Sequence, residues 1–171
     1  MLAVYPTVLP DVLVIKRKIS YDRRGFYAEM YSETDYHNAG ITVKFVEDDF
    51  SFSKKNVLRG LHGDSKTWKL VSCPFGRLYF VVLNYDEESK FYGRWVAMEI
   101  TPESCLQVLV PPRHANGHLV LSYAAIFHYK QSEYYRSADD QFVVKWNDPK
   151  FNISWPISET PILSARDSGK A

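Results

Sequence analysis

Short apolar runs separated by turn-forming residues are the feature that most restricts how this chain can fold. The longest uninterrupted apolar run, Leu78 to Leu83, has six residues. Similar runs rich in Val, Ile, Leu, Tyr and Phe recur at intervals of about 8–12 residues, with Pro and Gly between them. This spacing is typical of an antiparallel sandwich or barrel. The predicted strands are 26–32, 57–62, 69–73, 77–84, 93–100, 105–111, 118–121, 125–130 and 142–146.

Helical signals are weak in this chain. Thr34 to Gly40 fits one turn, with Thr34 as its N-cap and Gly40 at its end, and Pro102 to Cys105 fits another. No repeat, low-complexity tract or linker divides the 171 residues, and this length suits one domain. We therefore predict a single all-β domain over residues 1–171, with few short helices.

Composition argues against several classes of function. The 21 Lys and Arg against 20 Asp and Glu leave a formal charge of +1, without the basic excess of a nucleic-acid-binding domain. No run is long enough to cross a bilayer, and the N-terminus lacks the pattern of a secretory signal. Cys73 and Cys105 are too few for a disulfide framework, so a reducing cytoplasm is expected. We expect neither nucleic acid nor membrane as a partner.

Ionisable residues within apolar strands are the first candidates for a site, because a small barrel holds its site among inward-facing side chains. In the run RGLH, alternation places Arg59 and His62 on opposite faces, unless a bulge at Gly60 re-aims them. His62 would be a natural base near neutral pH. A histidine at such a position is also common as a core residue, so this motif alone does not decide between the two roles.

Three further candidates also have plain interpretations. Lys69 would be an edge charge or a cation held for an anion, Tyr129 a core filler, and Asp167 a surface carboxylate. His114 and His118 have helical metal-site spacing, but the prolines before them and the glycine between them argue against a helix. The sequence has no His-x-His pair, phosphate-binding loop, nucleophile elbow or dinucleotide fingerprint. We therefore predict no metal site.

A series of segments follows in an order that resembles a known family nearly end to end. The segments are Asp22–Glu29 (DRRGFYAE), Phe45–Ser53 (FVEDDFSFS), Val57–His62 (VLRGLH), Trp68–Leu70, Phe91–Trp95, Tyr129–Tyr135, Trp146–Pro149, Trp155–Pro156 and Leu163–Asp167 (LSARD). In type, order and spacing they resemble the dTDP-4-dehydrorhamnose 3,5-epimerase family, part of the cupin superfamily.

The resemblance implies a cupin-type jelly roll, a homodimer with exchanged N-terminal strands, and no metal or organic cofactor. The implied substrate is a nucleotide-diphosphate 4-keto-6-deoxy sugar, inverted at carbon 3, carbon 5 or both. The family's roles make His62 the base and Tyr129 the acid. Lys69 would stabilise the enolate oxygen, and Asp167 would orient His62. The implied substrate-binding residues are Arg59 on the diphosphate, Arg24 from the partner subunit, Phe26, Glu29, Glu47, Asp49, Asn116 and Tyr135.

One departure from the family pattern bears on the nucleotide. Glu47 and Asp49 replace a Gln and an Asn that can match the edge of thymine. Ionised carboxylates only accept hydrogen bonds, which suits the N–H and amino groups of guanine. We therefore predict a GDP carrier, as in the GDP-linked 4-keto-6-deoxy-heptose epimerases of bacterial capsule pathways. The alternative is that both carboxylates merely pair with a cation such as Lys44 or Arg24.

Two further departures bear on the sugar. Residues 111–118 read PPRHANGH where the family usually reads Pro-x-Gly-Phe-Ala-His-Gly-Phe. Asn116 thus replaces a histidine and cannot carry a proton, which leaves the number of inverted carbons open. His114 and His118 replace phenylalanines. Gly63 and Asp64 replace an aromatic residue and a glutamine, which would open space beside His62 for a bulkier sugar such as a heptose.

Competing functions remain at this point. A 3,4-ketoisomerase of a nucleotide sugar would use similar His and Tyr groups to move the ketone. A nucleotide-sugar-binding protein that has lost catalysis would retain the pocket, and the change at Asn116 keeps this alternative open. A metal-dependent cupin is the least favoured of the alternatives.

Overall fold

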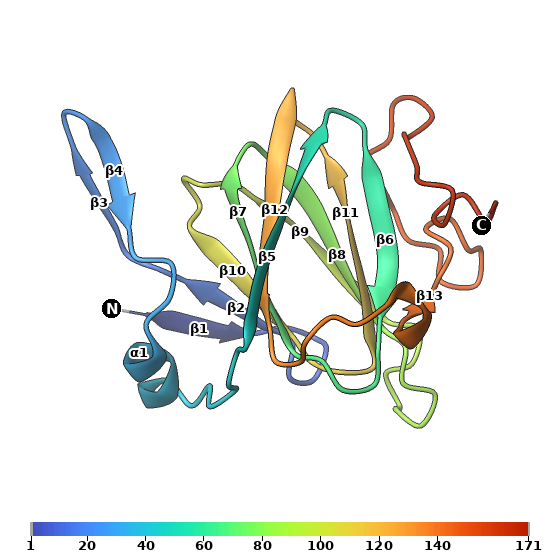
Figure 1. Cartoon of the computed structure of the whole chain (residues 1–171), viewed down its shortest axis with the longest axis horizontal. Helices are drawn as coiled ribbons and strands as arrows, with labels where there is room; N and C mark the ends of the chain where they lie inside the picture. The colour runs from blue at the N-terminus through green and yellow to red at the C-terminus, as the bar shows by residue number, and fades with distance from the viewer. Residues whose placement is uncertain (1, 171) are drawn as a thin grey trace.

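Two antiparallel sheets facing each other form the body of the molecule (Figure 1). The computed structural model describes residues 2–170. The larger sheet has the strand order β1-β2-β10-β7-β12-β5, and the smaller has the order β13-β6-β11-β8-β9. This architecture is the predicted cupin-type jelly roll, and the prediction of an all-β fold is confirmed.

The elements have the following bounds. The larger sheet contains β1 (Ala3–Pro6), β2 (Leu13–Lys16), β10 (Leu106–Val110), β7 (Lys69–Phe75), β12 (Ala124–Gln131) and β5 (Glu47–Lys54). The smaller contains β13 (Phe142–Val143), β6 (Leu58–Gly63), β11 (His114–Val120), β8 (Leu78–Asn84) and β9 (Trp95–Ile100). A separate hairpin pairs β3 (Ile19–Asp22) with β4 (Gly25–Ala28), and the helical elements are α1 (Glu33–Asn38) and the 3₁₀ turn η1 (Ala138–Asp140).

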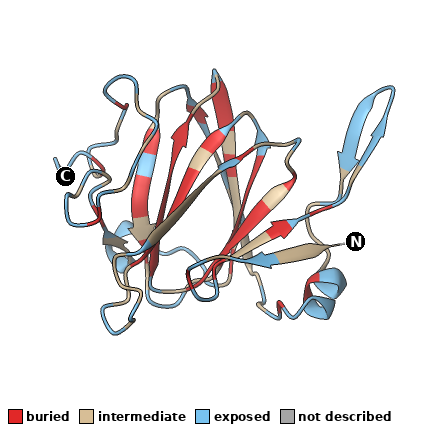
Figure 2. Cartoon of the chain, turned by 180° about the vertical axis from the view of Figure 1, so that it is seen from behind, coloured by how far each residue is buried: buried red, intermediate tan, exposed pale blue. Residues whose placement is uncertain are grey.

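The main core lies between the two sheets, where buried residues of both face one another (red in Figure 2). The six-residue apolar run in β8 is buried except at Tyr79, as predicted for a strand covered on both faces. Phe80 and its neighbours at alternate positions pack into the main core, whereas Val81 and Leu83 pack on the opposite face into a second cluster. Burial on both faces explains why this strand is apolar throughout rather than alternating.

Every predicted strand overlaps an observed one, but four strands were not predicted. β1, β2 and β3 have only four residues each and are largely exposed or half-buried. β5 begins with three acidic residues, which have low strand propensity. It forms because it pairs with β12 along its whole length, from Glu47 opposite Gln131 to Lys54 opposite Ala124. Tertiary pairing therefore overrides the local preference of this segment.

The helix predicted at Thr34 is present, but its start was placed wrongly. The N-cap of α1 is Ser32, whose side chain accepts a hydrogen bond from the backbone N–H of Asp35. Gly40 follows the helix with φ +84°, as its predicted role in ending the helix requires. Residues 102–105 form a turn rather than a helix. No helix within residues 2–170 combines the length and apolar character needed to cross a membrane.

Candidate active site

A cavity of about 320 Å³ opens between the two sheets and collects most of the predicted site residues. Seven of the twelve line it, and they come from β6, β7, β11, β12 and the segments that follow β12. They are Arg59, His62, Lys69, Asn116, Tyr129, Tyr135 and Asp167. The structure therefore brings together side chains that are up to 108 residues apart in the chain, from Arg59 to Asp167.

A bulge places Arg59 and His62 on the same cavity. Arg59 pairs with His118 and His62 with Asn116, so three steps along β6 match two along β11. At the irregularity Gly60 has φ +116°, and a Cβ there would lie 2.6 Å from the Cα of Gly117. Only glycine fits so close an approach of two strands. The bulge, which the sequence left as an alternative, thus overrides the simple alternation of faces.

His62 and Asp167 form a hydrogen-bonded pair. The Nε2 of His62 lies 2.6 Å from Oδ1 of Asp167, whose Oδ2 accepts a hydrogen bond of 2.8 Å from Ser164 Oγ. Burial alone would raise the pKa of Asp167. The hydrogen bond and charge of His62, the Ser164 hydroxyl and the backbone of Gly60 outweigh it and lower that pKa. An ionised Asp167 fixes a proton on Nε2 and leaves Nδ1 of His62 able to accept one.

Lys69 and Tyr129 lie together on neighbouring strands of the larger sheet. The Nζ of Lys69 is 5.4 Å from the centroid of the Tyr129 ring. Burial of Lys69 lowers its pKa, an effect that nearby Arg166 reinforces and Asp64 opposes. Burial raises the pKa of Tyr129 to about 12, and the adjacent Asp49 adds to the shift. Tyr129 therefore keeps its phenolic proton at neutral pH and is able to donate it.

Asn116 and Arg59 each have a defined hydrogen-bond partner in the cavity wall. Nδ2 of Asn116 donates to the backbone carbonyl of His62 at 3.0 Å, which ties β11 to the strand that carries the histidine. Nε of Arg59 donates to Ser53 Oγ at 3.0 Å. Arg59 lines the cavity, and its planar guanidinium suits an anion such as a diphosphate.

Several cavity residues were not predicted. Arg166 donates to the side chain of Gln141 and to the carbonyl of Ala138, so it ties η1 to the C-terminal segment. Arg166 and Ser164 belong to the LSARD segment. Because this segment led to the prediction of Asp167, it could also have predicted Arg166 and Ser164 as cavity residues. The lining residues absent from the prediction are Phe50, Ser51, Gly117, His118, Phe127, Gln141, Ser164 and Arg166.

Arg24, Phe26 and Glu29 do not reach the cavity of their own chain. Arg24 forms an ion pair with Asp22 on the β3–β4 hairpin, which extends away from the sheets (Figure 1). Phe26 packs against Tyr21 of the same hairpin, with ring centroids 5.7 Å apart. Glu29 accepts hydrogen bonds from the buried Arg17, through both its carboxylate and its backbone carbonyl.

Glu47 and Asp49 lie on β5 beside the cavity. Glu47 accepts a hydrogen bond from the Gln131 side chain and one of 3.2 Å from the backbone N–H of Tyr135. The salt bridges formed within residues 2–170 include neither carboxylate, and Arg24, one of the expected cations, is bound to Asp22. Burial and the negative charge of Glu47 raise the pKa of Asp49. Neither carboxylate thus forms the ion pair with Arg24 or Lys44 that a purely structural role was expected to supply, although the charge of Asp49 acts on the buried Lys69.

Gly63 does not open space beside His62, contrary to the expectation from side-chain volume. A Cβ at this position would lie 2.3 Å from the carbonyl oxygen of His114 and 2.7 Å from ring carbons of Phe142. The volume that an aromatic side chain would occupy is filled by Phe142, which pairs with Gly63 across β6 and β13. Gly63 is therefore required by packing, and it provides no argument for a larger sugar.

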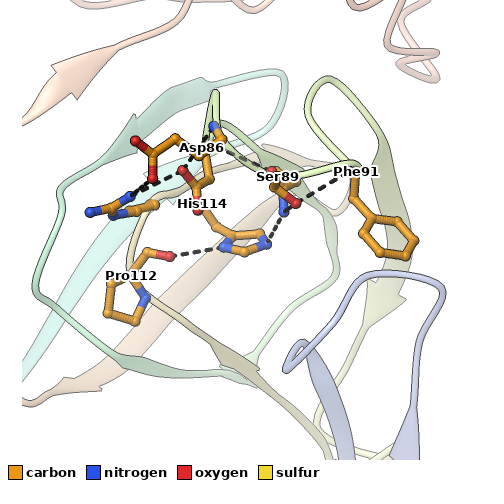
Figure 3. Close-up of polar contacts among 8 residues, drawn as sticks. Asp86, Ser89, Phe91, Pro112 and His114 are labelled. Atoms are coloured by element: carbon orange, nitrogen blue, oxygen red, sulfur yellow. Dashed lines mark hydrogen bonds and ion pairs between the residues drawn. The ribbon is translucent and has the colours of Figure 1, made fainter.

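His114 is a structural residue that is not among those lining the cavity, and its polar contacts are drawn in Figure 3. Its Nδ1 donates to the carbonyl of Pro112 at 3.0 Å, and its Nε2 accepts from Nδ2 of Asn84 at 3.1 Å. Burial lowers its pKa, so the ring is neutral. Arg113 beside it has φ +61° at the position where the family motif has glycine, and it forms an ion pair with Asp86 at 3.1 Å.

Buried neutral histidines predict a loss of stability in mild acid. Burial, with the charge of Arg59, lowers the pKa of His118 from 6.5 to about 3. The stability that this depressed pKa represents is complete above pH 6.5 and is lost as the pH falls from 6.5 towards 3. The expected slope is about 1.4 kcal/mol per pH unit for each such group, and His114 adds to it in the same direction. Urea unfolding at pH 7, 6, 5 and 4 should show a shallower dependence for His118→Phe than for the parent. Equal slopes would contradict this prediction.

The chain matches a known family model and several characterised relatives. Residues 6–171 match the model described as dTDP-4-dehydrorhamnose 3,5-epimerase. The dTDP-4-dehydrorhamnose 3,5-epimerase of Salmonella typhimurium is 39% identical over 172 residues, which cover 98% of this chain and 93% of the relative. The enzyme of the same name from Escherichia coli K12 is 37% identical over 165 residues, covering 94% and 89%.

Solved structures show the same fold. A dTDP-6-deoxy-D-glucose-3,5-epimerase of Legionella pneumophila, in complex with dTDP-4-keto-L-rhamnose, superposes with a TM-score of 0.93 at 35% identity. That similarity covers 99% of this chain and 91% of the other. A dTDP-4-dehydrorhamnose 3,5-epimerase of Bacillus anthracis, with TDP and PPi bound, has a TM-score of 0.91 at 32% identity over 98% of this chain and 97% of the other.

Proposed function

Because this chain belongs to the dTDP-4-dehydrorhamnose 3,5-epimerase family of isomerases, we propose that it inverts carbon 3, carbon 5 or both of a nucleotide-diphosphate 4-keto-6-deoxy sugar. The observation that carries the proposal is the gathering of His62, Asp167, Lys69 and Tyr129 around one cavity. Inversion beside a ketone requires a base, a proton donor and a group that stabilises the enolate oxygen, and these four side chains can supply them. The domain that carries the reaction is proposed to span residues 1–171.

The proposed reaction needs only proton transfers. Nδ1 of His62 takes the proton from the carbon next to the 4-keto group, and the C–H electron pair becomes the enolate. Lys69 stabilises the oxygen that gains negative charge. Tyr129 then gives its phenolic proton to the opposite face of the carbon. Solvent restores the proton to Tyr129, and His62 releases the proton that it took to solvent. No electron leaves the substrate, so the scheme requires no redox cofactor.

Incubation with GDP- and dTDP-linked 4-keto-6-deoxy sugars in D₂O tests the proposal. Deuterium is expected at carbon 3, carbon 5 or both, and NMR detects it. The labelled positions report how many carbons react in this protein, which has Asn116 where the family has a histidine. Failure of every such 4-keto substrate to exchange would end the epimerase proposal and favour a binding protein without catalysis. A ketone that moves from carbon 4 to carbon 3 would identify a 3,4-ketoisomerase instead.

GDP is the carrier that we propose, and a heptose is one sugar it could carry. Two carboxylates, Glu47 and Asp49, stand beside the cavity and form no salt bridge within residues 2–170, and the pKa of Asp49 is raised. Such a pair is stabilised by a ligand with two neighbouring N–H donors, as guanine has and thymine lacks. Against this, the relatives are named for dTDP sugars, and Glu47 already accepts hydrogen bonds from Gln131 and Tyr135.

Competition binding decides the carrier. GDP should displace a labelled nucleotide sugar at lower concentration than dTDP, and the double variant Glu47→Gln/Asp49→Asn should reverse or abolish this preference, since amides supply donors as well as acceptors. A clear preference of the parent protein for dTDP would refute the GDP carrier and leave the epimerase reaction untouched.

We also propose that the protein acts as a homodimer in which the N-terminal segment of each subunit completes the other's site. The proposal is supported by the projecting β3–β4 hairpin, which carries Arg24 and Phe26 away from the cavity of its own chain. Its exposed aromatic residues, Tyr21 and Tyr27, suit a covered position in an assembly. A cytoplasmic location remains a prediction from the sequence.

Mixing two inactive variants tests the shared site. Arg24→Ala and His62→Asn subunits are unfolded together and refolded as mixed dimers. If Arg24 serves the partner's cavity, one site of each mixed dimer regains both residues and activity returns. If Arg24 served its own chain, each site of the mixed dimer would lack either Arg24 or His62, and no activity would return.

A further inference from the structure

His118 presents a buried polar atom that the protein itself leaves unpaired. His118 is one of the residues that line the cavity, and it is 2% exposed. Nε2 of His118 has no hydrogen-bond partner, and within residues 2–170 the only other buried side-chain atom in this condition is Nη1 of Arg17. An unpaired buried polar atom is costly to a folded protein, so it calls for a partner that arrives from outside the chain.

The surroundings of His118 fix its ring without satisfying its nitrogen. The imidazole stacks on Phe127, with ring centroids 4.3 Å apart and planes at 16°. On the other side, β11 pairs His118 with Phe80 of β8. A phenylalanine, which the family motif has here, would fill this apolar slot without an unpaired atom. The imidazole is therefore difficult to explain by packing alone.

The position of His118 indicates which part of a ligand it meets. Its partner across β6 is Arg59, so both side chains stand on the same face of the smaller sheet. Arg59 is the residue proposed to hold the diphosphate, which is attached to carbon 1 of the sugar. The ring hydroxyl nearest to that attachment is the one on carbon 2. Lys69, proposed at the carbon-4 oxygen, comes from the opposite sheet.

We propose that His118 is a specificity-determining residue that hydrogen-bonds the carbon-2 hydroxyl of the nucleotide-linked sugar. The inference rests on the proposed function, because it takes the diphosphate at Arg59 as its reference point. The neutral imidazole has one N–H donor and one acceptor nitrogen, so it matches a hydroxyl in either direction. Carbon 2 does not react in the proposed scheme, so His118 selects and positions the sugar and takes no part in proton transfer.

Calorimetric titration with paired sugar conjugates tests the inference. The probes are the glucose and 2-deoxyglucose conjugates of GDP and of dTDP, together with GDP and dTDP alone. The parent protein should bind a glucose conjugate about ten-fold more tightly than its 2-deoxy counterpart, as expected for one buried hydrogen bond. His118→Phe should bind the two equally and bind the free nucleotide as the parent does. His118→Gln, which keeps a hydrogen-bonding group, should recover part of the preference.

The inference would be overturned by equal binding of the two conjugates to the parent protein, or by an undiminished preference in His118→Phe. A parent protein that binds neither conjugate would overturn it as well. Thermal unfolding of each variant shows that the fold is retained. The deuterium-exchange experiment decides the epimerase proposal separately, because a protein that discriminates at carbon 2 without exchanging protons would retain His118's binding role and lose only the proposed reaction.

Discussion

His62→Asn should abolish detectable deuterium exchange at both carbons beside the ketone, a loss of about 10²–10⁴-fold if His62 is the sole base. The same Nδ1 is proposed to serve every carbon that reacts, so one substitution removes all exchange. Asparagine keeps a hydrogen-bonding side chain near Asp167 but cannot accept a proton at neutral pH. The measurement is the rate at which deuterium enters the substrate, followed by NMR in separate incubations with equal amounts of the parent or the variant protein.

Tyr129→Phe is the matched control for this experiment. The phenol lies on the other sheet from His62 and is proposed to donate the second proton, so its removal should spare proton abstraction and slow inversion. Deuterium should then enter with the original configuration largely kept. Substantial exchange in His62→Asn would show that another group acts as the base. Loss of all exchange in Tyr129→Phe, with the fold intact, would contradict the division of roles between the two faces.

Lys69→Met should lower kcat by about 10²–10³-fold, the range found when one group that stabilises a developing oxyanion is removed. Lys69 is buried beside Tyr129, where a positive charge is poorly solvated and meets a negative oxygen with little screening by water. Methionine has a similar length and fills the same space. The fall should appear mainly in kcat, because the charge on the oxygen develops only after the substrate is bound.

Lys69→Met should also remain at least as stable as the parent protein. Burial lowers the pKa of Lys69, which means that the folded protein disfavours the charged form, so removing the charge relieves that cost. Urea unfolding at pH 7 provides this control. An unchanged kcat would refute the oxyanion role of Lys69. A fall confined to KM would instead make Lys69 a binding residue for the ground-state substrate.

Local patterns identified many of the strands whose own residues favour extended structure, although they missed β2, which contains Leu13, Val14 and Ile15. The run through β8 is apolar at consecutive positions because both faces of the strand are covered, and this apolar run allowed the strand to be predicted from the sequence. β5 was not predicted, because Glu47, Asp48 and Asp49 oppose strand formation and only the pairing with β12 holds them extended. The N-cap of α1 was misplaced by two residues, since Ser32 and Thr34 are both good caps and the chain path selects Ser32.

The sequence by itself determined the all-β class and, through the order of its motifs, the residues from which a site is built. Only the tertiary structure decided which of those residues meet. The bulge at Gly60 turns Arg59 and His62 to one cavity, whereas Arg24 remains on a hairpin directed away from it. Phe142 fills the space that Gly63 was expected to leave open, and His118 proved to be a buried residue with an unpaired nitrogen. Arg24 is held locally by Asp22 on its hairpin, and only the path of the chain directs that hairpin away from the cavity. For Gly60, Gly63 and His118 the physical reason is the same: the groups packed against them come from other strands, and a local pattern carries no record of them.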